Sequence, residues 1–242
     1  MKIVGLMVCG PGEVDRFLRR PLEQFKKLCD DVVICLNGND ENRDRVIKDY
    51  GFWSYHDDRE WGIYQPKIKT DLLKRIGKLR PDWVLPLDAD EEMVDMTRQT
   101  LEEISSERRA CYYYIVNLWN DEFHYKRAIS FWNIRFFKFM PSMGLEYIKK
   151  PVHCGLAPPY AYTFGTYVPH LVRHYGLMKS EDREKKVERY SRYDPQAKHL
   201  GLKSWYDALR QDGTGTFYDE VAVTMKIREE VSKMIHQKKY HE

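Results

Sequence analysis

The sequence lacks any apolar run long enough to cross a membrane, which takes about 20 residues. Its first eight residues form a strand pattern and lack the basic segment and apolar core of a secretory signal. Charge of one sign is also scarce, because the net charge is only +3 over 242 residues. So mild a charge argues against specific binding of nucleic acid, but it permits a locally basic surface. These absences predict a cytoplasmic protein.

Cysteine is scarce, and its number is odd. The five residues, Cys9, Cys29, Cys35, Cys111 and Cys154, include no close pair with the spacing of metal ligands. They therefore predict reduced thiols and argue against a disulfide framework or a zinc site. Aromatic residues are abundant by contrast, with 17 Tyr and 6 Trp. Flat rings with polar edges suit sugar binding, although they suit ordinary packing and interfaces equally well.

The first part of the chain alternates between apolar runs of strand length and amphipathic helical patterns. We expect strands at residues 2–9, 31–36, 52–55 and 83–87, and helices at 14–28, 41–50 and 67–79. Pro21 predicts a kink or a break in the first helix, and residues 61–65 are expected to form a loop. This alternation is typical of parallel strands joined by right-handed crossovers. The sequence therefore predicts an α/β fold with a Rossmann-like, mostly parallel central sheet flanked by helices.

The rhythm changes after Asp90. We expect a helix at residues 91–106, strands at 110–119, 130–140 and 166–175, a hairpin loop at 120–127, and a charged helix at 180–193. A last amphipathic helix is expected after Gly215.

An acidic pair ends the fourth predicted strand. Asp88 and Asp90 are separated by one residue, so an extended chain would point both side chains the same way. In an open α/β sheet, ligands bind at the carboxyl ends of the strands. Two carboxylates there suit a divalent cation that is also held by a substrate's phosphates. The alternative is an acidic turn that caps the next helix.

The stretch from Lys69 to Glu91 resembles the nucleotide-sugar glycosyltransferases of family 2, which have the A-type glycosyltransferase fold. Its helix is followed by Pro-Asp-Trp-Val-Leu-Pro-Leu-Asp-Ala-Asp-Glu, which is similar to the family's Asp-x-Asp strand. Weaker similarity lies in the segments Asn37-Gly38-Asn39 and His174-Tyr175-Gly176. One position departs from the pattern, because the family usually carries an Asp where Leu36 stands.

The resemblance implies transfer of a sugar, with inversion, from a nucleoside diphosphate donor to an acceptor hydroxyl. UDP is the expected nucleotide. The resemblance also implies Mn²⁺ or Mg²⁺ bound directly by Asp90, with Asp88 meeting the ribose or a metal-bound water. His174 is the candidate third ligand, with His153 and His170 as alternatives, and an imidazole ligand favours Mn²⁺. A hydrogen-bonded structural role is the other interpretation of such a histidine.

The same resemblance suggests three parts of the chain. Residues 1–106 would bind the nucleotide sugar, residues 107–178 would bind the acceptor, and residues 179–242 would form a C-terminal helical extension. The acceptor could be a saccharide, a lipid-linked molecule, a protein or a nucleobase. A basic C-terminal end (Lys238, Lys239) would permit peripheral contact with a membrane if the acceptor is lipid-linked. The sequence leaves a homodimer open.

Further candidates surround the donor. Asp57 and Asp58 end the third predicted strand, where this fold usually contacts the nucleotide base, and a plain polar turn is the alternative. Candidates for binding the diphosphate are Lys67 or Lys69, Lys186 and Arg189. The last two would share one helical face, as a lid that closes over phosphate requires. Solvated helix faces are the alternative.

An inverting transfer needs a carboxylate base within hydrogen-bond reach of the acceptor hydroxyl. Asp121 is the first candidate and Glu146 the second, and a surface loop acid is the alternative for both. In many relatives a Glu follows the His of a Val-His segment, whereas Cys154 follows His153 here.

Other classes remain open. A sugar-phosphate nucleotidyltransferase uses a similar sheet and metal carboxylates, but its first loop is usually Gly-rich and basic, unlike Gly10-Pro11-Gly12-Glu13. A non-catalytic nucleotide- or sugar-binding module would keep the fold without turnover. A phosphohydrolase of the Asp-x-Asp type is disfavoured because its acidic pair follows the first strand.

Overall fold

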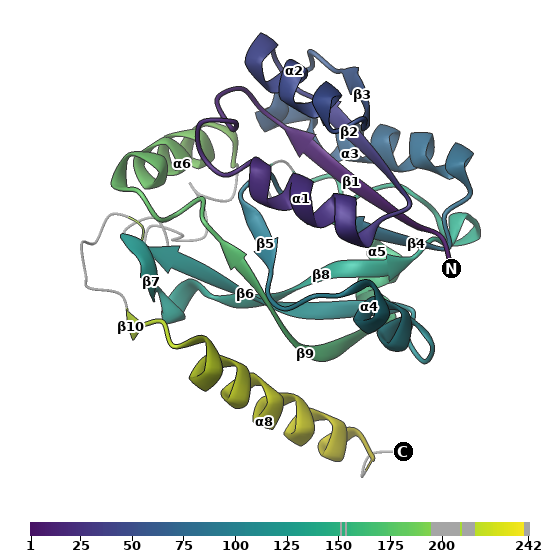
Figure 1. Ribbon diagram of the computed structural model, residues 1–242, viewed down its shortest axis with the longest axis vertical. Helices are drawn as coiled ribbons and strands as arrows, with labels where there is room; N and C mark the ends of the chain where they lie inside the picture. Colours follow the sequence, from purple (N-terminus) through teal and green to yellow (C-terminus); the bar gives the residue numbers. More distant parts are fainter. Residues whose placement is uncertain (151, 153, 195–208, 210–215, 240–242) are drawn as a thin grey trace.

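The computed structural model describes residues 1–150, 152, 154–194, 209 and 216–239 (Figure 1). The described helices are α1 (Arg19–Leu28), α2 (Glu41–Asp49), α3 (Trp61–Ile76), α4 (Arg98–Ser105), α5 (Pro159–Thr163), α6 (Ser180–Tyr193) and α8 (Glu220–Lys239). The described strands are β1 (Ile3–Cys9), β2 (Asp31–Leu36), β3 (Trp53–His56), β4 (Trp83–Pro86), β5 (Glu91–Met93), β6 (Ala110–Trp119), β7 (Asp121–Tyr125), β8 (Phe131–Lys138), β9 (Gly165–His174) and β10 (Thr216–Phe217).

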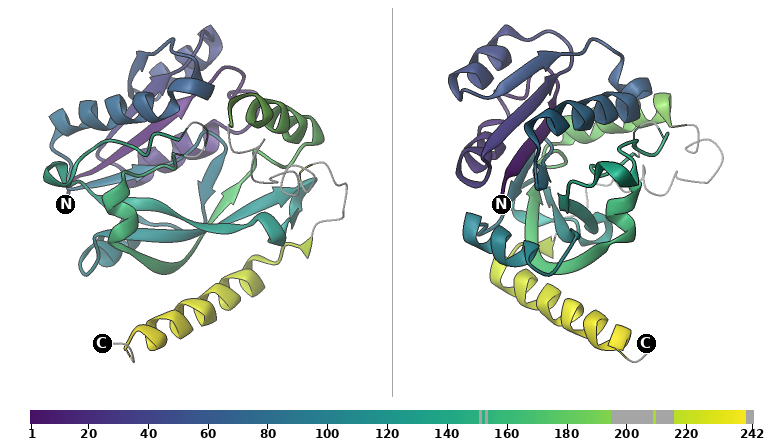
Figure 2. Two further views of the ribbon diagram at one scale, coloured as in Figure 1. Left: turned by 180° about the vertical axis from the view of Figure 1, so that it is seen from behind. Right: turned by 90° about the vertical axis from the view of Figure 1, so that its right-hand side faces the viewer.

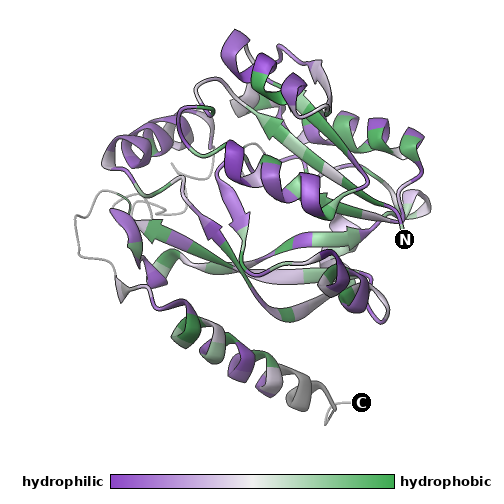
Figure 3. Cartoon of the chain, in the orientation of Figure 1, coloured by the Kyte–Doolittle hydropathy of each residue, from purple (hydrophilic) through white to green (hydrophobic). Residues whose placement is uncertain are grey.

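The N-terminal part of the sheet is parallel, in the order β4-β1-β2-β3. Helices cover both of its faces (Figure 2). Leu22 and Phe25 of α1 are buried on one face, and Leu72 and Ile76 of α3 are buried on the other. Because helices cover both faces, β1 and β4 are buried along nearly their whole length, and β1 is mostly hydrophobic (Figure 3). The predicted α/β class and Rossmann-like sheet are confirmed.

The C-terminal part of the sheet brings distant residues to the acidic pair. β8 continues the sheet from β4 in the antiparallel sense, and β6 and β7 follow by antiparallel pairing. β9 then pairs in parallel with β6 and antiparallel with β5. In this register His174, the last residue of β9, lies opposite both Glu91 and Asn117.

Several predicted boundaries are wrong. Residues 91–93 form strand β5 and not the start of a helix, which begins only at Arg98. Residues 61–65 open α3 and do not form a loop, although Pro66 lies within this helix. Residues 121–125 form β7 inside the predicted hairpin loop. Helix α1 begins at Arg19, so Pro21 lies in its first turn, where its missing N–H costs no intrahelical hydrogen bond.

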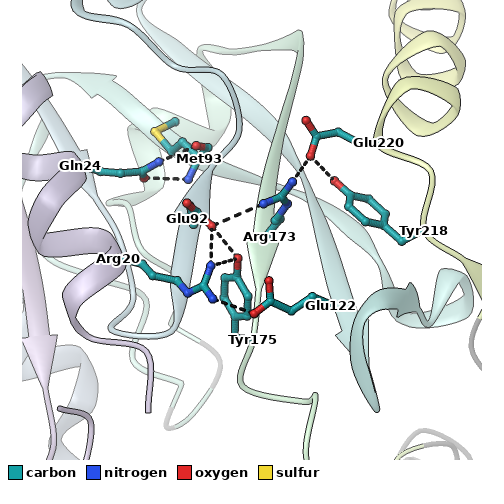
Figure 4. Close-up of polar contacts among 9 residues, drawn as sticks. All are labelled: Arg20, Gln24, Glu92, Met93, Glu122, Arg173, Tyr175, Tyr218 and Glu220. Carbon is teal, nitrogen blue, oxygen red and sulfur yellow. Dashed lines mark hydrogen bonds and ion pairs between the residues drawn. The ribbon is translucent and has the colours of Figure 1, made fainter. Parts of the chain in front are cut away.

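The last described helix, α8, packs on β9 through the buried side chains of Val223, Ile227 and Val231. Arg173 of β9 forms an ion pair with Glu220 of α8 and another, of 3.7 Å, with Glu92 of β5 (Figure 4). A polar network therefore joins this helix to the rest of the fold. None of the described helices is both long and apolar enough to cross a membrane. All five cysteines are free, as predicted.

Candidate functional site

The two acids after β4 face a common cavity. Asp88 and Asp90 both line a cavity of about 450 Å³ at the carboxyl ends of the parallel strands. The turn after β1 contributes Gly10 and Pro11 to its wall, and the loop after β2 contributes Asn37. Among the described residues, no Lys or Arg forms an ion pair with either acid. The pair is therefore open to a ligand.

A buried arginine holds the wall of this cavity in place. Arg43 of α2 is fully buried, and its guanidinium donates to the carbonyl oxygens of Cys9 (3.1 Å), Asn37 (3.1 Å) and Gly38 (2.7 Å). Gly38 has a φ of +75°, which glycine adopts without steric strain. The ends of β1 and β2 are thus tied together before any ligand binds.

Asp90 and His174 form a close pair of potential metal ligands in the cavity. Asp90 Oδ2 lies 3.3 Å from His174 Nε2. The other ring nitrogen, Nδ1, donates to Asn117 Oδ1 at 2.5 Å, because an amide oxygen can only accept. Asn117 Nδ2 donates in turn to the carbonyl of Ile129 (2.6 Å), which orients the amide. Burial acts to raise the pKa of Asp90, but the neighbouring imidazole outweighs it and holds that pKa below its usual range. Asp90 is therefore ionised.

Asp88 also lines a second cavity, of about 300 Å³, that continues from the first. Its walls include Lys69, Asn133 and the ion pair between Glu91 and Arg135. Arg135 is buried and donates to both carboxylate oxygens of Glu91, at 2.5 and 2.7 Å. Burial and the nearby charge of Glu91 raise the pKa of Asp88. Asp88 is thus the acid that the two cavities share.

Helix α6 covers both cavities with basic and aromatic side chains. Lys186 and Tyr190 line both of them, and Arg189 and Tyr193 line the first. The start of the helix is anchored by Asp182, which forms a 2.7 Å ion pair with Arg16. A phosphate group in the first cavity would therefore meet two cationic side chains on one helical face.

The residues present fit a divalent cation, although they do not enclose it. No group of three His, Cys, Asp or Glu side chains in the described part of the chain lies close enough to hold a metal ion. Asp90 would supply an oxygen, and Nε2 of His174, which must carry no proton to bind a metal, would supply a nitrogen. The hydrogen bond from Nδ1 to Asn117 is the kind that orients a histidine ligand. A metal bound here would need further oxygens from its substrate, as Mg²⁺ and Mn²⁺ at phosphate sites do.

Several predicted donor contacts lie outside these cavities. Asp57 forms an ion pair with Arg59, which also reaches Asp71, and Asp58 is exposed. Lys67 lines a separate, largely apolar hollow on α3. The structure thus brings Asp88, Asp90, His174, Lys186 and Arg189 together, and it leaves Asp57, Asp58 and Lys67 apart.

The predicted catalytic bases also lie away from both cavities. Asp121 accepts from His124 Nδ1 at 2.8 Å, and Glu146 forms a 3.0 Å ion pair with Lys74. The side chain of Glu146 is 63% exposed. His170, an alternative metal ligand, contacts the ring of Tyr113 and does not line either cavity. His153, the other alternative, lies outside the described residues, as do the side chains of Lys238 and Lys239.

Several polar residues that line the two cavities were not predicted to face a ligand. They include Glu13, Glu91, Asn117 and Arg135. Burial and the charge of Asp90 raise the pKa of Glu13 to about 7. The acidic sequence Glu91-Glu92 next to the Asp pair was the one available signal. Asn117 and Arg135 lie inside apolar strands, where a lone polar residue signals a buried partner without naming it.

Comparisons with known proteins support the fold. No protein-family model matches the sequence, and no curated protein matches it. The structure is similar to a crystal structure of TarS from S. aureus, with a TM-score of 0.54 and 10% identity over 85% of this chain. This chain covers 43% of that TarS chain, less than half of its length.

Two further solved structures resemble the chain more distantly. A TarS fragment (residues 1–349) in complex with UDP has a TM-score of 0.48 and 10% identity, over 87% of this chain and 70% of that one. CTP:phosphocholine cytidylyltransferase (LicC) from Streptococcus pneumoniae has a TM-score of 0.35 and 14% identity, over 57% of this chain and 68% of that one. At such identities the similarity to TarS establishes a shared α/β fold and nothing finer.

Proposed function

We propose that the chain is a metal-dependent, inverting glycosyltransferase that resembles family 2 and transfers a sugar from a UDP-sugar to an acceptor hydroxyl. The observation that carries the proposal is the shared cavity of Asp88 and Asp90, which His174, Lys186 and Arg189 also line. Two acids, an oriented histidine and two cations on one helix suit a diphosphate with its counter-ion. TarS shares this fold, and its fragment of residues 1–349 has been crystallised with UDP-GlcNAc and with UDP, which supports the choice of nucleotide.

Each residue has a separate role in this proposal. Asp90 and His174 would hold Mn²⁺ or Mg²⁺, which when bound would offset the negative charge of the departing diphosphate. Lys186 and Arg189 bind the diphosphate oxygens directly and so stabilise the same charge. The nucleoside lies against the wall formed by Pro11 and Asn37.

Asp88 is the carboxylate that we assign as the base. It lines both cavities, so it can face an acceptor hydroxyl in the second cavity and the donor in the first. Glu91, the other acid of the second cavity, already accepts two hydrogen bonds from Arg135. Removal of the hydroxyl proton by Asp88 makes the acceptor oxygen nucleophilic as it attacks the anomeric carbon.

A nucleotide panel tests the proposal. UDP should raise the melting temperature only when Mn²⁺ or Mg²⁺ is present, because ligands stabilise the native state by mass action. Asp90→Asn should abolish that shift. Asp88→Asn should keep a shift with UDP and metal but lose sugar transfer by about a hundredfold or more, the usual contribution of a general base.

Two outcomes would change the assignment. Formation of a nucleotide sugar from a nucleoside triphosphate and a sugar phosphate would identify a nucleotidyltransferase. Loss of transfer in Asp121→Asn or Glu146→Gln, with UDP binding intact, would move the base role to that residue. Absence of any nucleotide-dependent shift would contradict the proposal as a whole.

A further inference from the structure

Exposed apolar side chains gather with lysines on one surface beside the two cavities. Ile63 (47% exposed) and Tyr64 (45%) lie on the first turn of α3. Ile148 (41%) lies on the segment that follows β8, between Tyr147 and Lys149, which line the same hollow as Ile63 and Tyr64. We call this region the apolar–basic surface and define it by Ile63, Tyr64 and Ile148 together with Lys67, Lys149 and the adjacent Lys150. It is distinct from the cavities that the Asp pair lines.

This surface contains a hollow of about 320 Å³. The hollow is lined by Ile63, Tyr64, Pro66, Tyr147 and Thr70, together with Lys67, Lys149 and Glu146. The lining is therefore mostly apolar, with two ammonium groups and one carboxylate at its edge. That combination suits hydrocarbon next to negative charge, because a lysine stem can lie along apolar surface while its ammonium group stays in water.

Hydrogen bonds fix the apolar–basic surface to the rest of the fold. The backbone N–H of Tyr147 donates to Thr70 Oγ1 of α3 at 3.0 Å, and its hydroxyl donates to the carbonyl of Leu156 at 3.0 Å. Glu146, the acid of this region, is paired with Lys74 at 3.0 Å. In the part of the chain that the structure describes, no carboxylate forms an ion pair with Lys67, Lys149 or Lys150. The surface therefore carries an excess of positive charge.

The charge favours a membrane over a protein as the partner. Lysine is depleted at protein–protein interfaces, whereas lysines interspersed with apolar side chains are typical of segments that bind anionic membranes. Each lysine near an anionic leaflet attracts it, and exposed apolar side chains add burial at the headgroup boundary. Ile63 and Ile148 are placed to enter that boundary beside the lysines.

The position of the surface connects it to the catalytic cavities. Tyr64 and Pro66 line the hollow, and Gln65 between them lines both cavities. We propose that the apolar–basic surface docks on an anionic phospholipid membrane and thereby sets the mouth of the second cavity near the bilayer. The consequence that the acceptor is lipid-linked rests on the proposed function, whereas the docking itself does not.

Vesicle co-sedimentation tests the docking without any nucleotide. The full chain should bind vesicles of phosphatidylcholine with about 30% phosphatidylglycerol at 0.1 M NaCl, and it should bind pure phosphatidylcholine at least about tenfold more weakly. The double variant K67E/K149E should weaken binding at least about tenfold, since it reverses two charges of the surface. K27E/K48E is the matched control, because these exposed lysines lie on α1 and α2 and change the net charge equally.

A second variant tests how much the apolar side chains contribute to vesicle binding. I63S/I148S should weaken binding to anionic vesicles about tenfold or more, as loss of two buried apolar side chains requires. V221S/M225S is its control, because these exposed side chains lie on α8. Melting temperature and the UDP shift of every variant show whether the fold and the donor site are intact.

Three results would overturn the inference. The first is that the full chain does not bind anionic vesicles. The second is that the surface variants and their controls lose the same amount of vesicle binding. The third is that the chain forms a dimer that I63S/I148S dissociates, while neither protein binds vesicles. Each can occur while UDP still raises the melting temperature, so it would leave the proposed function standing. Conversely, a nucleotide panel without response would remove the proposed function and leave the docking intact.

Discussion

The ring of Tyr193, at the end of α6, lies directly over Gly62 in the first turn of α3, so closely that a Cβ at Gly62 would overlap the ring. The Tyr193 hydroxyl donates to the carboxylate of Glu60. Tyr193 and Gly62 both line the first cavity. The end of α6 therefore closes that cavity only because residue 62 has no side chain.

Gly62→Ala should weaken UDP binding on the order of tenfold, equivalent to about 1.4 kcal/mol, because Tyr193 must move off α3. Stability should hold or rise by up to about 1 kcal/mol, since alanine favours a helix over glycine. Calorimetric titration with UDP and Mn²⁺ measures the first effect, and urea unfolding measures the second.

A double-mutant cycle supplies the control for Gly62→Ala. In a Tyr193→Ala background the ring that Gly62 accommodates is absent, so the added methyl group should change UDP affinity little. Equal losses in both backgrounds would show that contact with Tyr193 is not the cause.

The buried pair of Glu91 and Arg135 makes a separate prediction about stability. Both side chains are at most 3% exposed. Arg135→Met leaves the Glu91 carboxylate buried beside Asp88, which should lower the free energy of unfolding by about 3–5 kcal/mol. The double variant Glu91→Gln/Arg135→Met should lose clearly less, because no unpaired charge remains. Urea unfolding measures the free energy of unfolding of both variants. An equal loss of stability in the two would contradict the ion-pair explanation.

Asn117 should act on metal binding through His174. Asn117→Leu removes the acceptor of the Nδ1–H and should weaken Mn²⁺ binding in the presence of UDP about 10- to 100-fold. Asn117→Asp keeps an acceptor oxygen and should retain binding. Metal titration by calorimetry at fixed UDP measures both. Equal affinity in wild type and Asn117→Leu would exclude this orienting role.

The parallel part of the sheet was predictable because it depends on local patterns. Apolar runs such as residues 31–36, followed by turns and amphipathic helices, are sufficient to predict β1 to β4. Strand β5 was not predictable in this way. Glu91 and Glu92 favour a helix by propensity, but the pairing with β9 and the ion pair with Arg135, 44 residues away, outweigh that preference. Pro66 likewise favours a helix start at residue 67, whereas α3 begins at Trp61.

In the candidate site, too, local patterns could be predicted from the sequence and distant contacts could not. Asp88 and Asp90 were identified because their spacing and position after a strand carry information. His174, Lys186 and Arg189 came from resemblance, and the structure places them beside the acids. Asp121, Glu146, Asp57, Asp58 and Lys67 lie elsewhere, because the direction of a loop or helix face depends on contacts that a single sequence does not specify. Their predicted roles remain predictions.

Glu13 makes stability depend on pH, because its partly buried carboxyl lies near the charge of Asp90. Its pKa is raised from an ordinary value of 4.5 to about 7. Below pH 4.5 the carboxyl is protonated in both folded and unfolded chains, so it has no effect. Between these two values the unfolded chain loses the proton first, so stability falls as pH rises. Above about pH 7 the full cost remains, at most roughly 3 kcal/mol.

Glu13→Gln should remove this pH dependence. Urea unfolding in EDTA at pH 5 and pH 8 should show that wild type loses about 2–3 kcal/mol more than the variant between the two conditions. The attraction of Arg16, 3.1 Å from Glu13, already contributes to the pKa of about 7, so the comparison needs no separate correction for this ion pair. Glu188→Gln, an exposed acid on α6, is the control and should follow wild type. If Glu13→Gln follows wild type as well, the Glu13 carboxyl titrates normally and lies in a more polar setting than its burial indicates.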